Sequence, residues 1–452
     1  MSDGSLFVYN HGNEYHNIFP VWNWFLIPGT TVQLGTHTLT CSRTNFYGLE
    51  SFVGGVTNGW YSTTVMNFTS NSVDRLKFRK GWFTFGTVTV AMVNGLSVAS
   101  GVTPNIVTTL DQKWISGNVV TSGSSLTAPA VTFPAETEKT DSSVSWLWHD
   151  SVGYVFPSNA NSNTADNVPL TLSTKTRSGD WNSIGAFNGP VSGKVFTATI
   201  RHNVRPITYF IVLRSSLSQF QGSIQSMLND IGIISNTPFI MAAHQTSTKS
   251  TGIIFYAAGT VFIPQRNFSI KANAPCTIMI SPVTATTIRL SVSDPSQLRP
   301  NLVISISRAV TCTGCRAVTG WTDVAVTLPT GEWAGSTRSI VLTSAQNWLN
   351  EVAPSIYTIG KDPSLFKYGY AIFAFGCAFL VFVVRGYCIH DPATSTPSMI
   401  EVWKGSTKAY TYQRVSSDLE VAAEVSGEGV DQEDNCEGED EKESLLKTWR
   451  DV

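Results

Sequence analysis

The feature that most constrains the fold is the recurrence of short β-branched runs between residues 13 and 308. Such runs lie at 86–93, 194–200, 207–213, 286–292 and 302–306. Clusters of Gly, Asn, Pro and Ser separate them, which is typical of strands joined by polar turns. Many strands without alternating helices favour sandwiches over an α/β fold. We therefore expect an all-β body.

One segment departs from this pattern. Residues 217–230 place Leu217, Phe220, Ile224 and Met227 at roughly helical spacing. We expect a helix there, linking a first β-domain over 13–216 to a second over 231–321. Residues 1–12 form a leader for which the sequence predicts no structure.

The composition excludes several functional classes. Charged residues make up 14% of the chain and the formal net charge is -2, and no basic stripe marks a nucleic-acid footprint. We find no metal-ligand cluster, phosphate-binding glycine loop or nucleophile elbow. The sequence predicts no cofactor, no metal and no nucleic-acid partner.

The cysteines do not form a disulfide framework. The chain has 7 of them, and Cys312 and Cys315 make the only close pair. A redox or zinc role would require a second pair or a βαβ context. We expect either a local disulfide or two free thiols.

The last third of the chain has a different organisation. We interpret residues 322–365 as a stalk, 366–385 as a transmembrane helix and 386–452 as a disordered acidic cytosolic tail. No charged residue occurs from Tyr368 to Val384, between Lys367 and Arg385, and such a stretch approaches the length that spans a bilayer. The alternative is a buried core helix or strand pair.

Short motifs agree with a single-pass membrane protein. Asn67 and Asn267 lie in glycosylation sequons. In the tail, Tyr412 and Val415 fit a tyrosine-based endocytic pattern, and Glu441, Leu445 and Leu446 fit an acidic-dileucine pattern. We expect extracellular or lumenal β-domains at the plasma membrane or an endo-lysosomal membrane, with sorting adaptors as partners of the tail.

The first ten residues lack the basic and apolar regions of a signal peptide. We therefore expect this sequence to be the C-terminal part of a larger protein. The alternative is that the apolar span itself targets the chain.

The β-rich part of the chain carries a series of motifs that occur together, and in this order, in one known family. They are Asn13-Glu-Tyr-His-Asn-Ile-Phe-Pro-Val-Trp-Asn-Trp-Phe-Leu-Ile-Pro-Gly-Thr-Thr31, Phe52-Val-Gly-Gly-Val-Thr-Asn-Gly59, Arg79-Lys-Gly-Trp-Phe-Thr-Phe85, Val107 to Lys113, Trp146-Leu-Trp-His-Asp-Ser-Val-Gly-Tyr-Val-Phe-Pro157, Gly179-Asp-Trp-Asn-Ser-Ile-Gly185, Ile233 to Pro238 and Leu290 to Pro295. Together they resemble polysaccharide lyase family 8, the hyaluronate, chondroitin and xanthan lyases. The resemblance implies a large multi-sheet β-sandwich, or supersandwich, followed by a smaller antiparallel β-sandwich. Two positions depart from the family pattern: Asn23 stands where Asp is usual, and Arg201-His202-Asn203 where Asp-His-Gly is typical.

The resemblance also implies a reaction and two site residues. These lyases cleave uronic-acid-containing glycans by β-elimination, with an Asn, a His, a Tyr and an Arg on an α-helical toroid domain that precedes the β-domains. The family's supporting Glu corresponds to Glu14, which would orient those partners, and a substrate-contacting Asn corresponds to Asn17. For Glu14 the alternative is a surface carboxylate at a strand start.

Other candidates favour structural roles. His16, His149 and His202 lie on strand-like segments among aromatic residues, and we expect them to be structural. Trp22 and Trp24 alternate along an expected strand and would share a face, which favours core packing over sugar stacking.

Two functions remain. The first is the C-terminal part of a membrane-anchored lyase acting on an acidic polysaccharide such as hyaluronan or chondroitin, with the isolated chain inactive. The second is a non-catalytic cell-surface module that binds glycans.

Overall fold

The computed structural model describes residues 3–36, 48–123, 125–157, 168–185, 189–202 and 204–348. Within these ranges, no helix is long and apolar enough to cross a membrane. The expected transmembrane helix over 366–385 and the acidic tail over 386–452, with Tyr412, Val415, Glu441, Leu445 and Leu446, lie outside the described residues.

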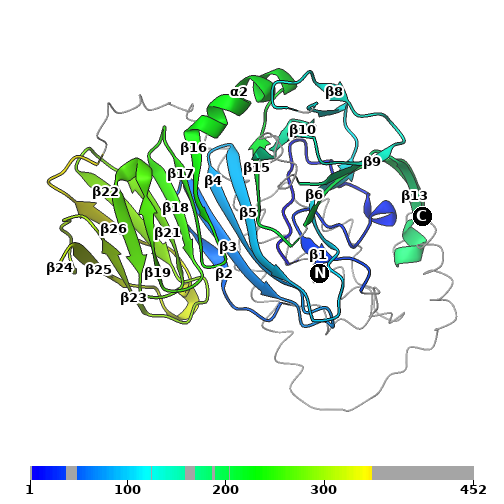
Figure 1. The fold of residues 1–452 in the computed structure, drawn as a ribbon. Helices are drawn as coiled ribbons and strands as arrows, with labels where there is room; N and C mark the ends of the chain where they lie inside the picture. The colour runs from blue at the N-terminus through cyan, green and yellow to red at the C-terminus, as the bar shows by residue number, and fades with distance from the viewer. Residues whose placement is uncertain are drawn as a thin grey trace, which may run out of the picture. The chain divides into compact units, whose positions relative to one another are not determined.

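The first β-domain contains two antiparallel sheets (Figure 1). The 6-stranded sheet follows the order β1 (Thr31–Gln33), β6 (Ile106–Trp114), β14 (Pro190–His202), β12 (Leu170–Ser173), β9 (Glu138–Asp141), with β13 (Thr176–Asp180) also paired to β14. The 9-stranded sheet follows the order β2 (Val53–Thr57), β3 (Tyr61–Thr69), β4 (Lys77–Phe85), β5 (Val88–Ser97), β15 (Ile207–Leu213), β11 (Val152–Val155), β10 (Trp146–His149), β7 (Val119–Thr121), β8 (Val131–Thr132).

Both faces of the 9-stranded sheet are buried at its centre. Because side chains alternate along a strand, Phe78 and Trp82 of β4 enter the core shared with the 6-stranded sheet. Phe83 and Phe85 enter a second core on the opposite face. This two-sided burial explains why the strands at 86–93 and 207–213 read as nearly continuous apolar runs.

The second core is closed by the predicted helix and by the C-terminal domain. The helix α2 (Leu217–Asp230) begins with a capping box between Ser216 and Gln219 and buries Phe220, Ile224 and Met227. Met241 and Ile254 of the C-terminal domain complete the core. The helix therefore covers the sheet as well as linking two domains (Figure 1).

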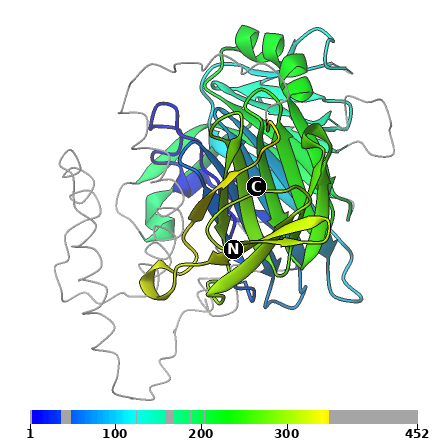
Figure 2. The same cartoon turned by 90° about the vertical axis from the view of Figure 1, so that its left-hand side faces the viewer.

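The C-terminal domain is an antiparallel sandwich, facing the reader in Figure 2. One sheet has the order β16 (Ile231–Asn236), β17 (Ile240–Gln245), β18 (Ser250–Phe255), β21 (Cys276–Pro282), β22 (Thr287–Ser293), β26 (Arg338–Thr343). The other has the order β19 (Gly259–Ile263), β20 (Phe268–Ala272), β23 (Asn301–Ile306), β25 (Trp321–Thr327), β24 (Cys315–Val318). Short 3-10 helices are η1 (Phe19–Val21), η2 (Trp181–Ile184), η3 (Pro264–Arg266) and η4 (Gly331–Trp333).

The expected stalk was wrong for its first part. Residues 322–327 belong to β25, and β26 adds a further strand beside β22. Val324 and Val326 alternate into the sandwich core, which is the period-2 pattern of a strand. Trp348, the last described residue, is also buried in that core.

The close cysteine pair forms a disulfide. Cys312 and Cys315 are joined, which selects the first of the two alternatives that the sequence left open. Cys276 is a free, buried thiol.

Candidate functional site

The Glu14 loop, residues 10–17, carries both site residues that the resemblance implies. The Glu14 carboxylate is buried and accepts hydrogen bonds from the backbone N–H groups of Asn10, His11 (2.6 Å) and Gly12 (2.8 Å). Burial acts to raise the pKa of Glu14, but these backbone donors outweigh it and lower the pKa below the ordinary value. Glu14 is therefore a fixed anion that shapes its own loop.

A buried charge cluster lies beneath the loop. The Lys113 side chain is fully buried on β6, with Nζ 3.1 Å from Asp150 Oδ2 and 3.5 Å from Asp111 Oδ2. Tyr15 donates its hydroxyl to Asp111 Oδ1 over 2.8 Å. Burial raises the pKa of Asp111 despite Lys113. The Tyr15 side chain thus connects the Glu14 loop to the charge cluster through its hydrogen bond to Asp111.

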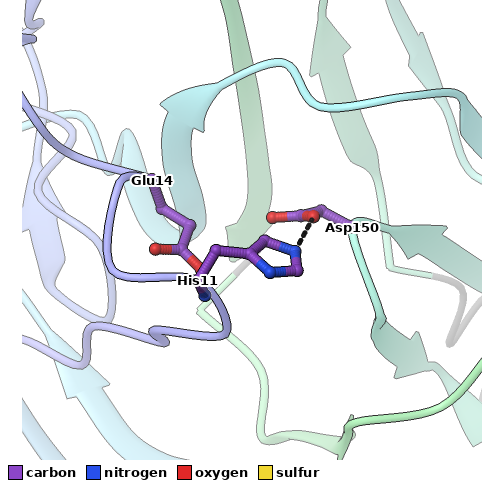
Figure 3. A group of neighbouring side chains, drawn as sticks. All are labelled: His11, Glu14 and Asp150. Atoms are coloured by element: carbon purple, nitrogen blue, oxygen red, sulfur yellow. Dashed lines mark hydrogen bonds and ion pairs between the residues drawn. The ribbon is translucent and has the colours of Figure 1, made fainter.

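Asp150 joins the cluster to the start of the loop (Figure 3). Its Oδ1 lies 3.2 Å from His11 Nε2, and its backbone carbonyl accepts from Asn10 Nδ2 over 2.7 Å. Burial acts to raise the pKa of Asp150, but Lys113 and His11 outweigh it and lower the pKa. The backbone N–H groups of Asn10 and His11 bind Glu14 while their side chains bind Asp150, so a continuous network connects Lys113 to Glu14.

Asp150 can contact both Lys113 and the Glu14 loop because it lies in the turn between β10 and β11. Asp150 and Ser151 have φ of 49° and 61°, and they join His149 directly to Val152 in the hairpin. Two consecutive left-handed residues are the signature of a tight two-residue hairpin turn, and Asp tolerates this conformation well.

His11, Glu14 and Asp150 also offer three ligand atoms within 4.8 Å of one another, a set that suits a divalent cation. Each atom already has a hydrogen-bond partner: three backbone donors for Glu14, and one another for His11 and Asp150. The Lys113 ammonium lies directly behind Asp150. Hydrogen bonds already occupy these ligand atoms, and the Lys113 ammonium would repel a second cation. We therefore assign His11, Glu14 and Asp150 a structural role.

Asn17 lies at the exposed end of the loop. It has a left-handed backbone with φ of 58°, and its Oδ1 accepts a hydrogen bond from Trp181 Nε1 of η2. The neighbouring indole, Trp114 Nε1, donates to the carbonyl of His16 over 2.7 Å. Two partly exposed tryptophans thus flank Asn17.

Gly179 allows Trp181 to lie close to the Glu14 loop. A Cβ on Gly179 would lie 1.9 Å from the carbonyl oxygen of Pro20, so only glycine fits between β13 and η1. The ring of Phe19 then lies 6.1 Å from that of Trp181. Packing of β13 against η1 therefore fixes the position of Trp181 relative to the loop.

We expected the two tryptophans of the opening motif to alternate along a strand, and this prediction was wrong. Trp22 follows η1 and Trp24 lies in a turn, because Pro20 favours a helical first turn over an extended strand. Their rings nevertheless stack, with centroids 6.2 Å apart. Trp22 is buried in a small aromatic core with Tyr15, whereas Trp24 is partly exposed.

The histidines have different environments. His149 and His202 are buried on β10 and β14 and burial lowers the pKa of each to about 3, as expected of neutral structural residues. His16 is exposed in a turn of the Glu14 loop, so the expected strand was wrong there, because residues 13–17 form turns.

Sequence reasoning missed the residues that support the loop: Asn10, His11, Lys113, Asp150 and Trp181. His149-Asp150 and Gly179-Asp-Trp181 stood in motifs quoted for the resemblance, but nothing local indicates contact with residues more than 130 positions away. The signal that the sequence offered was the spacing of Asp111 and Lys113, since two opposite charges two residues apart on a strand lie on the same face.

Both glycosylation candidates fall on described residues. Asn267 is exposed in a left-handed C-cap after η3. Asn67 is half-buried on β3, and its Oδ1 accepts from Arg79 Nε at 3.4 Å. Asn267 is thus the more accessible of the two.

Comparison with known proteins matches this arrangement. Residues 1–223 match the super-sandwich domain of polysaccharide lyase family 8, and residues 232–302 match the C-terminal beta-sandwich domain of that family. Chondroitinase-AC of Pedobacter heparinus is 30% identical over 351 residues, covering 75% of this chain and 45% of that protein.

Solved structures give the same result. A chondroitinase AC lyase known from enzyme–oligosaccharide complexes aligns with a TM-score of 0.59 and 27% identity over 73% of this chain and 45% of that chain. A Paenibacillus xanthan lyase shares the fold, with a TM-score of 0.61 and 18% identity over 78% of this chain and 34% of that chain.

The chain spans less than half the length of these relatives. Both of its β-domains match one family, in the family's order. The chain therefore belongs to polysaccharide lyase family 8.

Proposed function

We propose that the chain forms the β-domain part of a lyase that cleaves uronic-acid-containing glycans, such as hyaluronan or chondroitin, by β-elimination. The observation that carries the proposal is the Glu14 loop, where a fixed carboxylate and an exposed carboxamide lie three residues apart on a rigid support. Family membership supplies the reaction class.

The reaction removes the weakly acidic proton at C5 of the uronate, so the developing negative charge needs fixed donors and a cation. Glu14 is an anion and cannot provide these itself. Its role would be to orient cationic and phenolic groups supplied by an α-helical domain, while Asn17 contacts substrate. We therefore propose that the isolated chain is inactive.

A lyase assay tests this proposal. Purified chain incubated with hyaluronan and with chondroitin should release no unsaturated uronate, whereas the native protein recovered from its source should release it. The Glu14→Gln and Asn17→Ala variants of the native protein should lose that activity, with a Trp333→Phe variant as a distant surface control.

The second candidate is a non-catalytic cell-surface module that binds glycans. The partly exposed indoles of Trp114 and Trp181 beside Asn17 favour it, because aromatic faces and amide donors suit sugar rings. Glycan binding by native protein without unsaturated product would select this candidate.

We further propose a single-pass membrane protein anchored through 366–385. Its β-domains would be extracellular or lumenal, and its tail would bind sorting adaptors through Tyr412 and Leu445–Leu446. Glycan attached at Asn267, detected by glycosidase-sensitive mass, would support this orientation, and cytosolic labelling of the β-domains would contradict it.

A further inference from the structure

The Asn17 carboxamide has one acceptor end and one donor end, and a ligand could in principle meet either. The indole Nε1–H of Trp181 can only donate a hydrogen bond. The Asn17 atom that it meets must therefore be Oδ1, the acceptor. The identity of the partner thus fixes which end of the amide is which.

With Oδ1 occupied, the remaining group of Asn17 is its NH2. Within the described part of the chain, no group accepts a hydrogen bond from Asn17 Nδ2, and the residue is exposed. The left-handed backbone at Asn17 suits asparagine better than most residues. The site therefore presents two N–H donors to solvent.

The surroundings hold this geometry in place. The backbone N–H of Trp181 donates to Gly189 at 3.0 Å, and its ring contacts Phe19. The N-cap Asp180 accepts from Asn182 N at 2.7 Å and begins η2 at Trp181. The indole is thus held independently of Asn17, on an element that lies more than 160 residues away in sequence.

We propose that Trp181 is a positioning residue that holds the Asn17 carboxamide with its NH2 group toward the ligand, so that Asn17 selects an acceptor oxygen of the glycan, namely a uronate carboxylate. The inference rests on the proposed function for its ligand class. N–H donors bind anionic oxygens more strongly than neutral ones, so the carboxylate is favoured over a hydroxyl. The partly exposed ring of Trp181 offers the sugar an apolar face beside that donor.

The pairing is tested first, without any ligand. In full chain labelled with 15N-tryptophan, the Trp181 indole signal is identified by its loss in Trp181→Phe. Asn17→Leu removes the acceptor and should speed exchange of that indole proton about tenfold, the effect of one hydrogen bond. Asn17→Asp keeps an acceptor and should preserve the protection. If the exchange rate of the Trp181 indole proton is the same in Asn17→Leu and Asn17→Asp as in the unaltered chain, the pairing is overturned.

The ligand class is tested with a hyaluronan hexasaccharide and its carboxyl-reduced form. Unaltered chain should bind the carboxylate form more tightly, and Trp181→Phe should reduce this preference about tenfold while keeping an aromatic ring. Asn17→Asp should abolish it through charge repulsion. Trp333→Phe, at a tryptophan 72% exposed in the other domain, is the matched control and should change nothing.

The two proposals fail differently. A preference that survives Trp181→Phe overturns the positioning role although the chain binds uronate glycans. Binding of neither hexasaccharide by unaltered chain overturns the ligand class of Asn17. The lyase assay on the native protein still decides the proposed function, and the indole result still decides the Asn17–Trp181 pairing.

Discussion

Replacing Lys113 by Met should destabilise the central domain strongly. The Lys113 side chain is 0% exposed, and its two carboxylate partners, Asp111 and Asp150, are 2% and 4% exposed. Met has nearly the same length, so packing is kept while the cation is lost. Removal of one partner from a buried ion pair costs about 3–5 kcal/mol, because the charge left behind is uncompensated.

Protonation limits this cost. Neutralising one carboxyl group of ordinary pKa at pH 7 requires about 4 kcal/mol, which is close to the cost of leaving it charged. In Lys113→Met the folded-state pKa of Asp111, already raised by burial, should rise further, and that of Asp150 should rise above the unfolded value. Such groups contribute stability below the unfolded pKa and lose it as pH rises, so the variant's deficit should be large at pH 7 and small near pH 4.

The assay is equilibrium unfolding in guanidinium chloride followed by tryptophan fluorescence at both pH values. Lys113→Met combined with Asp111→Asn and Asp150→Asn should recover much of the loss. Lys139→Met is the control, since its pair with Asp141 is exposed and should be worth less than about 1 kcal/mol. A Lys113→Met loss of that small size, or one equal at both pH values, would refute the reasoning.

Three further predictions follow from other sites. Burial lowers the pKa of Lys80 to about 7, so between pH 7 and the ordinary lysine pKa the unfolded chain binds more protons than the folded chain. The free energy of unfolding should therefore rise by about 1.4 kcal/mol per pH unit in that range. Lys80→Met should remove this slope in denaturant titrations. Burial lowers the pKa of three histidines, to about 3 for His149 and His202 and to about 4 for His244. Stability should fall as pH drops below about 6.5, since only the unfolded state takes up their protons. A His149→Gln/His202→Gln variant whose stability falls with pH as steeply as that of the unaltered chain would contradict this. Gly179→Ala should lower the melting temperature and shift the Trp181 indole signal, because its Cβ collides with the Pro20 carbonyl. Gly222→Ala, at an open position on α2, should leave that signal in place.

The strands and the core could be predicted from sequence because alternation is a local signal. The runs at 207–213 and 302–306 and the helix over 217–230 occur where the pattern predicts them. The described part of the expected stalk, residues 322–348, was misread because Thr and Gly obscure the alternation of Val324 and Val326, and because β26 is held by pairing with β22 more than by apolar content.

The site was predictable only in part. The resemblance placed Glu14 and Asn17 three residues apart, and their loop makes them neighbours. The groups that hold them, Asp150 and Trp181, come from a hairpin turn and from a short 3-10 helix. Their distances from the loop are set by sheet topology, which no local periodicity encodes.

The most direct test of the central claim is to incubate the native protein, recovered through an antibody to its acidic tail, with hyaluronan and chondroitin and to follow the ultraviolet absorbance of unsaturated uronate. We predict that product forms and that Glu14→Gln and Asn17→Ala abolish it. Glycan binding with no unsaturated product from the unaltered native protein would contradict the lyase assignment and leave a binding module.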